Sequence, residues 1–179
     1  MTLSEKHQNF LSRFAKPDLH YSFEDAPFAY LSNANITSRH IDRALNDEDE
    51  FVRIAALKHP NVTKEHIEMV LNDNRFRNIR SYAVGHPNIT SDQLNRALDD
   101  PDKCVRINAV RNKNVSSDHL DKALNDKYYE VRDNAIKQQS ITKQQLIKGL
   151  HDEDEIVRNS AMRNPKYKEY FPNGHIGLI

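Results

Sequence analysis

One segment of about 26 residues recurs five times along the chain, and this recurrence constrains the fold more than any local propensity. Four copies have 26 residues and the second has 27. In an array of this kind, each copy packs mainly against its neighbours. We therefore expect a stack of similar units. The five copies cover residues 35–60, 61–87, 88–113, 114–139 and 140–165.

The first half of each copy predicts a short helix. An apolar residue is followed by Thr or Ser, whose hydroxyl can cap the free amides of a first helical turn. The apolar residue before the cap can pack on a residue four positions into the helix, as a hydrophobic staple. Gln93 and Gln145 also complete capping boxes. The expected caps and staple partners are Thr37 with Ile41, Thr63 with Ile67, Thr90 with Leu94, Ser116 with Leu120, and Thr142 with Leu146.

The second half of each copy predicts another helix after an acidic turn. An Asp is followed six or seven residues later by Arg, which comes directly after a β-branched residue. An Ala and a larger apolar residue come next, and the small Ala lets neighbouring helices approach to about 8–10 Å. The Ala pairs are Ala56-Leu57, Ala83-Val84, Ala109-Val110, Ala135-Ile136 and Ala161-Met162.

These patterns resemble a known class of helical repeats. The string from Asp100 to Arg106, followed by Ala109-Val110, resembles the second-helix signature of HEAT-like repeats. The joins His-Pro-Asn-Val-Thr at 59–63 and His-Pro-Asn-Ile-Thr at 86–90 are similar to those of the leucine-rich-repeat variant, a HEAT relative. The resemblance covers 35–165 and implies an all-α, right-handed α-solenoid. It also implies a binding scaffold, although a minority of such proteins grip or repair DNA.

Some members of the variant family carry an iron–sulfur cluster on an N-terminal cysteine cluster. This chain has one cysteine, Cys104, so we expect no such cofactor, no metal and no internal disulfide. A reducing, cytoplasmic setting fits that cysteine content. No apolar run resembles a signal peptide or a membrane helix, and no glycine-rich phosphate loop occurs.

The two ends depart from the repeat. Residues 1–34 resemble an irregular helical cap, whose second part matches a degenerate copy. Residues 166–179 form the other end, where Tyr167, Tyr170 and Phe171 are expected to cover the last copy. The tail from His175 to Ile179 is either disordered or packed back on the stack.

Two columns of cations are candidate sites. The chain has 26 basic and 26 acidic residues, so attraction to nucleic acid must come from a local patch. The Arg after each β-branched residue could grip phosphates, but its spacing from the Asp favours a ladder of bonds within and between turns. A second column can form a positive stripe for phosphates or an acidic partner, or complement helix dipoles. The Arg column is Arg53, Arg80, Arg106, Arg132 and Arg158; the stripe is Lys58, Arg111, Lys137 and Arg163.

The acidic turns vary most between copies, which makes them candidates for specific recognition. Exposed aromatic residues beside cations resemble interface anchors and can also stack on single-stranded bases. The alternative is that they cover the neighbouring turn. The residues of this predicted contact edge are Arg75, Phe76, Arg77, Tyr128 and Tyr129.

Five histidines recur in two columns, one copy apart. That distance is too great for a shared metal ion, so we expect surface or junction residues. The columns are His40, His66 and His119, and His59 and His86.

The sequence thus favours a non-catalytic protein-interaction scaffold, adaptor or inhibitor, of phage or bacterial style. The alternative is nucleic-acid binding through the stripe. An enzyme such as a HEAT-like DNA glycosylase is a distant third, because no catalytic constellation stands out.

Overall fold

The computed structural model describes residues 36–73 and 77–174, and within these ranges it contains eleven α-helices and no strand. The all-α prediction is therefore confirmed for the described residues. The chain divides into two compact units, residues 1–88 and 89–179. The predicted N-terminal cap, Arg75, Phe76 and the tail from His175 lie outside the described residues.

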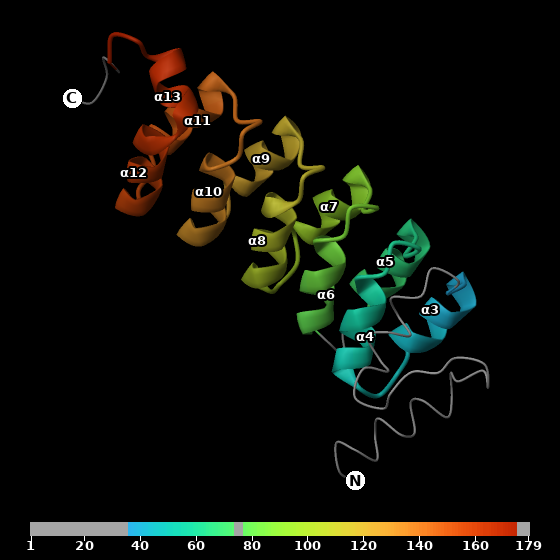
Figure 1. Cartoon of the computed structure of the whole chain (residues 1–179). Coiled ribbons are helices and arrows are strands. Elements are labelled where there is room, and N and C mark those ends of the chain that lie inside the picture. The colour runs from blue at the N-terminus through green and yellow to red at the C-terminus, as the bar shows by residue number, and fades with distance from the viewer. Residues whose placement is uncertain (1–35, 74–76, 175–179) are drawn as a thin grey trace. The chain divides into compact units, whose positions relative to one another are not determined.

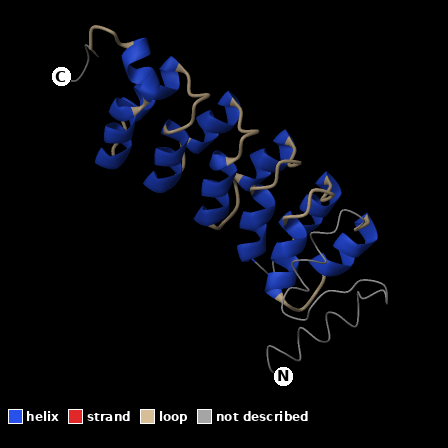
Figure 2. Ribbon diagram, viewed as in Figure 1, coloured by secondary structure: helices blue, strands red, loops and turns tan. Residues whose placement is uncertain are grey.

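The first unit contains two helix pairs, with α4 beside α6 and α3 beside α5 (Figure 1). The first helix of each pair packs against the second, and the pairs are joined by short turns (Figure 2). The helices are α3 (Ser38–Leu45), α4 (Glu50–Leu57), α5 (Lys64–Leu71) and α6 (Arg77–Val84).

The second unit contains three helix pairs and one further short helix. The second helices of the pairs, α8, α10 and α12, lie side by side in a row, and α13 adjoins α12 (Figure 1). The helices are α7 (Ser91–Ala97), α8 (Lys103–Arg111), α9 (Ser117–Ala123), α10 (Tyr129–Ile136), α11 (Lys143–Leu150), α12 (Glu155–Arg163) and α13 (Pro165–Tyr170).

The first helix of every pair begins at the predicted cap residue. Thr63, Thr90, Ser116 and Thr142 each accept a hydrogen bond from the third residue of the helix, and that residue's side chain returns a bond to the cap backbone. Thr37 directly precedes α3, and its backbone N–H donates to His40 Nδ1 at 3.2 Å. The predicted caps are therefore correct.

Histidine takes the glutamine position in three of these capping boxes. The His119 ring is only 4% exposed, and its Nδ1 accepts from Ser116 N–H at 3.0 Å. Its Nε2 lies 3.0 Å from the carbonyl oxygen of Ser91, one helix pair earlier. Gln145 makes the matching contact to Ser117 O at 2.8 Å. Of the two predicted alternatives, the histidine column is therefore a junction column.

The second histidine column lies in the turns between pairs. His59 and His86 are buried, and Nδ1 of each accepts from a backbone N–H two residues later. Asn112 accepts the equivalent bond with its amide oxygen. These side chains therefore shape the turns.

The asparagines that follow these turns tie each pair to the previous one. Asn61, Asn88 and Asn114 donate through Nδ2 to the carbonyls of Ile36, Val62 and Ile89, at 2.9, 2.7 and 3.2 Å. Lys166 stands at the corresponding position, and its Nζ reaches Ile141 O at 3.0 Å. The repeat spacing therefore extends to the start of α13.

The core consists of the predicted apolar columns. The staple residues Ile41, Ile67, Leu94, Leu120 and Leu146 are completely buried. The last copy differs from the others at one core position: Met162 is 41% exposed, whereas Leu57, Val84, Val110 and Ile136 at the same position are buried. The physical reason is that no following helix pair covers this side of α12 in the described residues.

The last helix covers only part of this end. Tyr170 donates its hydroxyl to Ile141 O at 3.2 Å, and the Tyr167 and Phe171 rings lie 5.3 Å apart. All three predicted aromatic residues remain half-buried, and α13 has no fully buried residue.

Candidate partner-binding surface

The five arginines of the ladder column are anchored to the turn that precedes their own helix. Each donates through Nη1 to the backbone carbonyl of the Asp six or seven residues earlier. Four of them are buried, so they cannot form a phosphate-binding row, and the structural interpretation is correct for them. The pairs are Arg53–Asp47, Arg80–Asp73, Arg106–Asp100, Arg132–Asp126 and Arg158–Asp152.

Two of these arginines also bind the carboxylate of the next pair. Arg106 donates to Asp126 through Nε and Nη2, and Arg132 binds Asp152 in the same two-bond arrangement. The side chains of both pairs are less than a tenth exposed. The hydrogen bonds that the two arginines donate to the carboxylates raise the pKa of Arg106 and of Arg132, against the opposing effect of burial.

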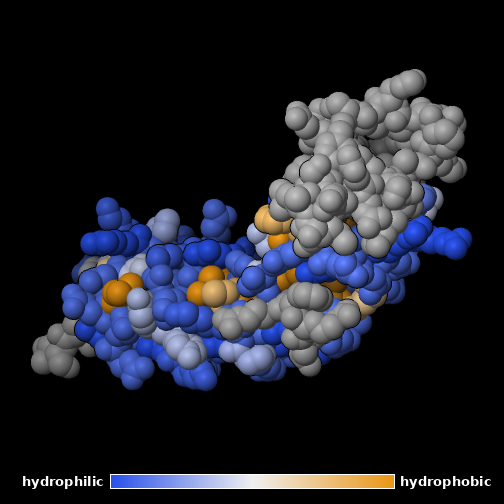
Figure 3. All heavy atoms as spheres, turned by 90° about the horizontal axis from the view of Figure 1, so that it is seen from below, coloured by the Kyte–Doolittle hydropathy of each residue, from blue (hydrophilic) through white to orange (hydrophobic). Residues whose placement is uncertain are grey.

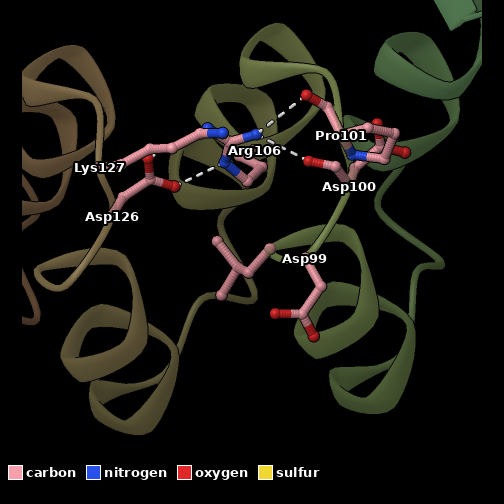
Figure 4. Close-up of a pocket in the computed structure, with 7 residues that line it drawn as sticks. Asp99, Asp100, Pro101, Arg106, Asp126 and Lys127 are labelled. Atoms are coloured by element: carbon pink, nitrogen blue, oxygen red, sulfur yellow. Dashed lines mark hydrogen bonds and ion pairs between the residues drawn. The ribbon is translucent and has the colours of Figure 1, made fainter.

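An open hollow of about 300 Å³ lies beside the first of these ion pairs (Figure 4). Arg106 points into the space between the turns that carry Asp100 and Asp126, and Lys127 extends toward it (Figure 4). Because the guanidinium of Arg106 is already bound, Lys127 is the cation of this lining that can meet a partner. The lining residues are Leu98, Asp99, Asp100, Pro101, Arg106, Asp126 and Lys127.

Tyr128, at the start of α10, is the most cation-rich aromatic residue of the described chain. Its side chain is exposed, yet Lys103 Nζ, Arg106 Cζ and Lys127 Nζ lie 5.3, 5.3 and 5.2 Å from its ring centroid. Such contacts contribute about 0.5–1 kcal/mol each at exposed sites and hold the ring in place. We call Lys103, Lys127, Tyr128 and Tyr129 the Tyr128 turn.

The acidic partner of the Tyr128 turn is Glu130. Its carboxylate lies 2.7 Å from Lys103 Nζ, and this bond raises the pKa of the lysine and lowers that of the glutamate. Sequence reasoning singled out Tyr128 but did not join it to Lys103. A signal was available, because the two residues are 25 positions apart, one fewer than the repeat length of 26, so they come from neighbouring copies.

The other residues of the predicted contact edge lie in different parts of the chain. Tyr129 is the first residue of α10 and is half-buried. Arg77 begins α6 in the first unit, while Arg75 and Phe76 lie outside the described residues. The side chains of this edge that the structure describes are therefore those of Tyr128 and Tyr129.

The predicted basic stripe is exposed, but two of its cations are engaged locally. Arg111 donates through Nε to Asn134 Oδ1 at 2.7 Å. Lys137 forms an ion pair with Asp133 at 2.5 Å. Arg163 is the exposed last residue of α12.

The fourth residue of the stripe, Lys58, belongs to the first unit. Its Nζ lies 5.9 Å from the ring centroid of Tyr82, which is itself exposed. This pair is a simpler counterpart of the Tyr128 turn, because among the described residues one cation instead of three lies near its ring.

Hydrophobic residues on the visible face of Figure 3 form small patches within a largely hydrophilic surface. The exposed large hydrophobic residues are Phe51, Met69, Tyr82, Tyr128, Ile156 and Met162.

Within residues 36–73 and 77–174, no three His, Cys, Asp or Glu side chains come together to hold a metal ion. Among the same residues, no helix has the length and apolar character that crossing a membrane requires. No family model matches the chain, and no curated protein is similar enough to count as a relative.

Proposed function

We propose that this protein is a non-catalytic scaffold that binds a protein partner through the Tyr128 turn. The observation that carries the proposal is the position of Tyr128, 39% exposed while three cations surround its ring. Tyr and Arg dominate the energetic centres of protein interfaces, and an aromatic ring that is already held loses little entropy on binding.

The partner surface that fits this turn is apolar at its centre and acidic at its edge. The phenol offers a flat hydrophobic face, and Lys127 offers a charge that no acidic side chain neutralises in the described residues. A rim charge of this kind mainly accelerates association and selects for acidic partners. Lys103 is less available because Glu130 already binds it.

The scaffold that presents this turn is, in our proposal, a right-handed α-solenoid of five HEAT-like or leucine-rich-repeat-variant units in the cytoplasm. Its support is the recurrence of the same three contacts: the capping box, the asparagine bond to the previous pair and the arginine bond to the turn. A turn edge in such a stack is free to vary, because the columns that hold the stack lie elsewhere.

Binding of a nucleic-acid backbone is the second candidate, through Arg111, Lys137 and Arg163 together with stacking on Tyr128. Its support is that these cations follow or end the neighbouring helices α8, α10 and α12. Against it, Asp133 already neutralises Lys137, and Asn134 already occupies Arg111 Nε. Protein binding is therefore preferred.

The test is site-specific photo-crosslinking from position 128 in an extract of the native host, followed by binding of the purified full chain to the partner identified. We expect Tyr128→Ala to weaken that binding by at least about tenfold. The control is Tyr82→Ala, which removes another exposed tyrosine beside a lysine. Equal affinities of the two variants would refute the Tyr128 turn as the contact surface.

The nucleic-acid alternative is tested with labelled single-stranded and duplex oligonucleotides across a salt series. Binding that weakens steeply with salt and is lost in Arg111→Ala/Lys137→Ala would establish the second candidate instead.

A further inference from the structure

The middle of α12 carries a half-buried arginine in the same setting as two carboxylate-binding arginines. Arg158 donates through Nη1 to the carbonyls of Asp152 and Glu153, at 2.7 and 2.8 Å. Arg106 and Arg132 are anchored through Nη1 in the same way. The shared anchor implies that the Nε–Nη2 edge of Arg158 faces the same way along the row of helices.

In the second unit, that edge binds a carboxylate in the two other arginines of the ladder column. Arg106 and Arg132 use Nε and Nη2 to bind the two oxygens of the Asp that comes 20 residues later. Twenty residues after Arg158 the sequence has Leu178, which has no carboxylate. The Nε and Nη2 of Arg158 have no partner in the part of the chain that the structure describes.

A hydrophobic side chain beside it is also uncovered. Met162 is one helical turn from Arg158 and exposed, whereas Ile136, at the same position of α10, is completely buried. Ile136 is covered by α11, where Gly149 approaches so closely that a β-carbon would overlap the Ile136 side chain. A single segment, from Gly149 to Asp152, therefore both covers Ile136 and binds Arg132.

We propose that the exposed face of α12 is a docking site for an acidic protein segment, namely a helix end with a small residue three positions before an Asp. The Asp carboxylate binds the Nε–Nη2 edge of Arg158, and the small residue packs on Met162. The chain itself shows the carboxylate bond twice, to Asp126 and to Asp152, and each Asp comes three residues after a small residue, Ala123 or Gly149. The close packing of the small residue is shown by Gly149 against Ile136. Two parallel N–H···O bonds to a carboxylate are the geometry that a guanidinium favours.

A phosphate would also fit an arginine edge. It would not use Met162, which supplies the hydrophobic half of the surface. The acidic turn before α12 also opposes a doubly charged anion, because Glu153 and Glu155 are both exposed near Arg158. A single carboxylate on a helix end is therefore favoured.

The test uses the full chain with ¹⁵N-labelled arginine and a synthetic peptide of this chain's own residues His119–Tyr128, stapled between positions 121 and 125 to hold it helical. The Arg158 Nε–H signal is assigned by its absence from the spectrum of Arg158→Lys. We expect a saturable shift of that signal with this peptide. The same peptide with Asp126→Asn should bind at least about fivefold more weakly, since it offers no carboxylate.

Two variants of the full chain separate the parts of the site. Arg158→Lys keeps the charge but loses the paired donors, and Met162→Glu removes the apolar contact. Each variant should therefore bind the peptide that carries Asp126 at least about threefold more weakly than the parent chain. Equal binding of the Asp and Asn peptides, or an unmoved Arg158 signal, would overturn the proposal. A stronger Arg158 shift with inorganic phosphate than with the Asp peptide would overturn it in favour of a general anion site. Tyr128→Ala should leave peptide binding unchanged. The proposal for this site and the proposal for the Tyr128 turn can therefore be refuted separately.

Discussion

Asp126 joins two arginines from different helices: its carboxylate binds Arg106 at 2.5 and 3.1 Å, and its backbone carbonyl accepts from Arg132 Nη1 at 2.8 Å. Asp152 does the same for Arg132 and Arg158. Each Asp therefore connects one helix pair to the next, and the loss of one carboxylate affects both.

Replacement of Asp126 by Ala should lower the free energy of unfolding by about 3–5 kcal/mol, because it leaves the buried guanidinium of Arg106 without its carboxylate. Urea unfolding followed by circular dichroism measures this. The control is Asp118→Ala, since Asp118 is exposed in the first turn of α9. A loss no greater than that of the control would show that the pair adds nothing to stability.

Acid should destabilise the second unit through Asp152. Burial raises the pKa of this carboxyl, but the hydrogen bonds from Arg132 and from Asp154 N–H outweigh it, and the pKa lies below its ordinary value of 3.8. A lowered pKa in the folded state means that the stabilisation is complete above the ordinary pKa and is lost as the pH falls through the folded value.

We therefore expect the urea midpoint to decline as the pH falls below about 4, and to decline less in Asp152→Asn than in the parent chain. Asp118→Asn is the matched control and should follow the parent. Parallel pH profiles for the parent and Asp152→Asn would contradict the assignment.

The capping boxes predict the effect of replacing His119 by glutamine, because glutamine takes the same position in the boxes of α7 and α11. His119→Gln should be nearly neutral, because Gln145 closes the same box and reaches the same preceding carbonyl position. His119→Ala should cost about 1–2 kcal/mol, since it removes both the bond to the cap and the bond to Ser91. Thermal and urea unfolding of the two variants compares them directly. A Gln variant as unstable as the Ala variant would show that ring packing, rather than capping, gives His119 its role.

Gly149 should not tolerate a methyl group. Its β-carbon would overlap the Ile136 side chain and approach Ala161 Cβ to 3.3 Å, so Gly149→Ala should destabilise by about 1–3 kcal/mol. Gly85→Ala is the control, because its nearest new contact is a backbone oxygen at an ordinary 3.4 Å. That change should be neutral or slightly stabilising. Urea unfolding measures both, and a stabilised Gly149→Ala would mean that the helices can separate at no cost.

Much of the helical structure could be predicted because it depends on neighbours along the chain. A hydroxyl before a helix, a staple four residues on and an Arg six residues after its Asp are short-range patterns, and Thr142, Leu146 and Arg158 behave as these patterns require. Their outcome follows from backbone geometry, which a short segment largely specifies by itself.

The contacts of the candidate sites depended instead on side chains from other helices. Periodicity marks Lys137 and Tyr128 as exposed, but it cannot show that Asp133 neutralises one or that Lys103 lies against the other. It also places Met162 in the same buried column as Ile136, although only Ile136 is covered by a following helix. The sequence by itself determined the helices and their buried faces. The tertiary structure decided which charges remain free and which apolar side chains stay exposed, because both depend on atoms brought within a few ångströms by packing.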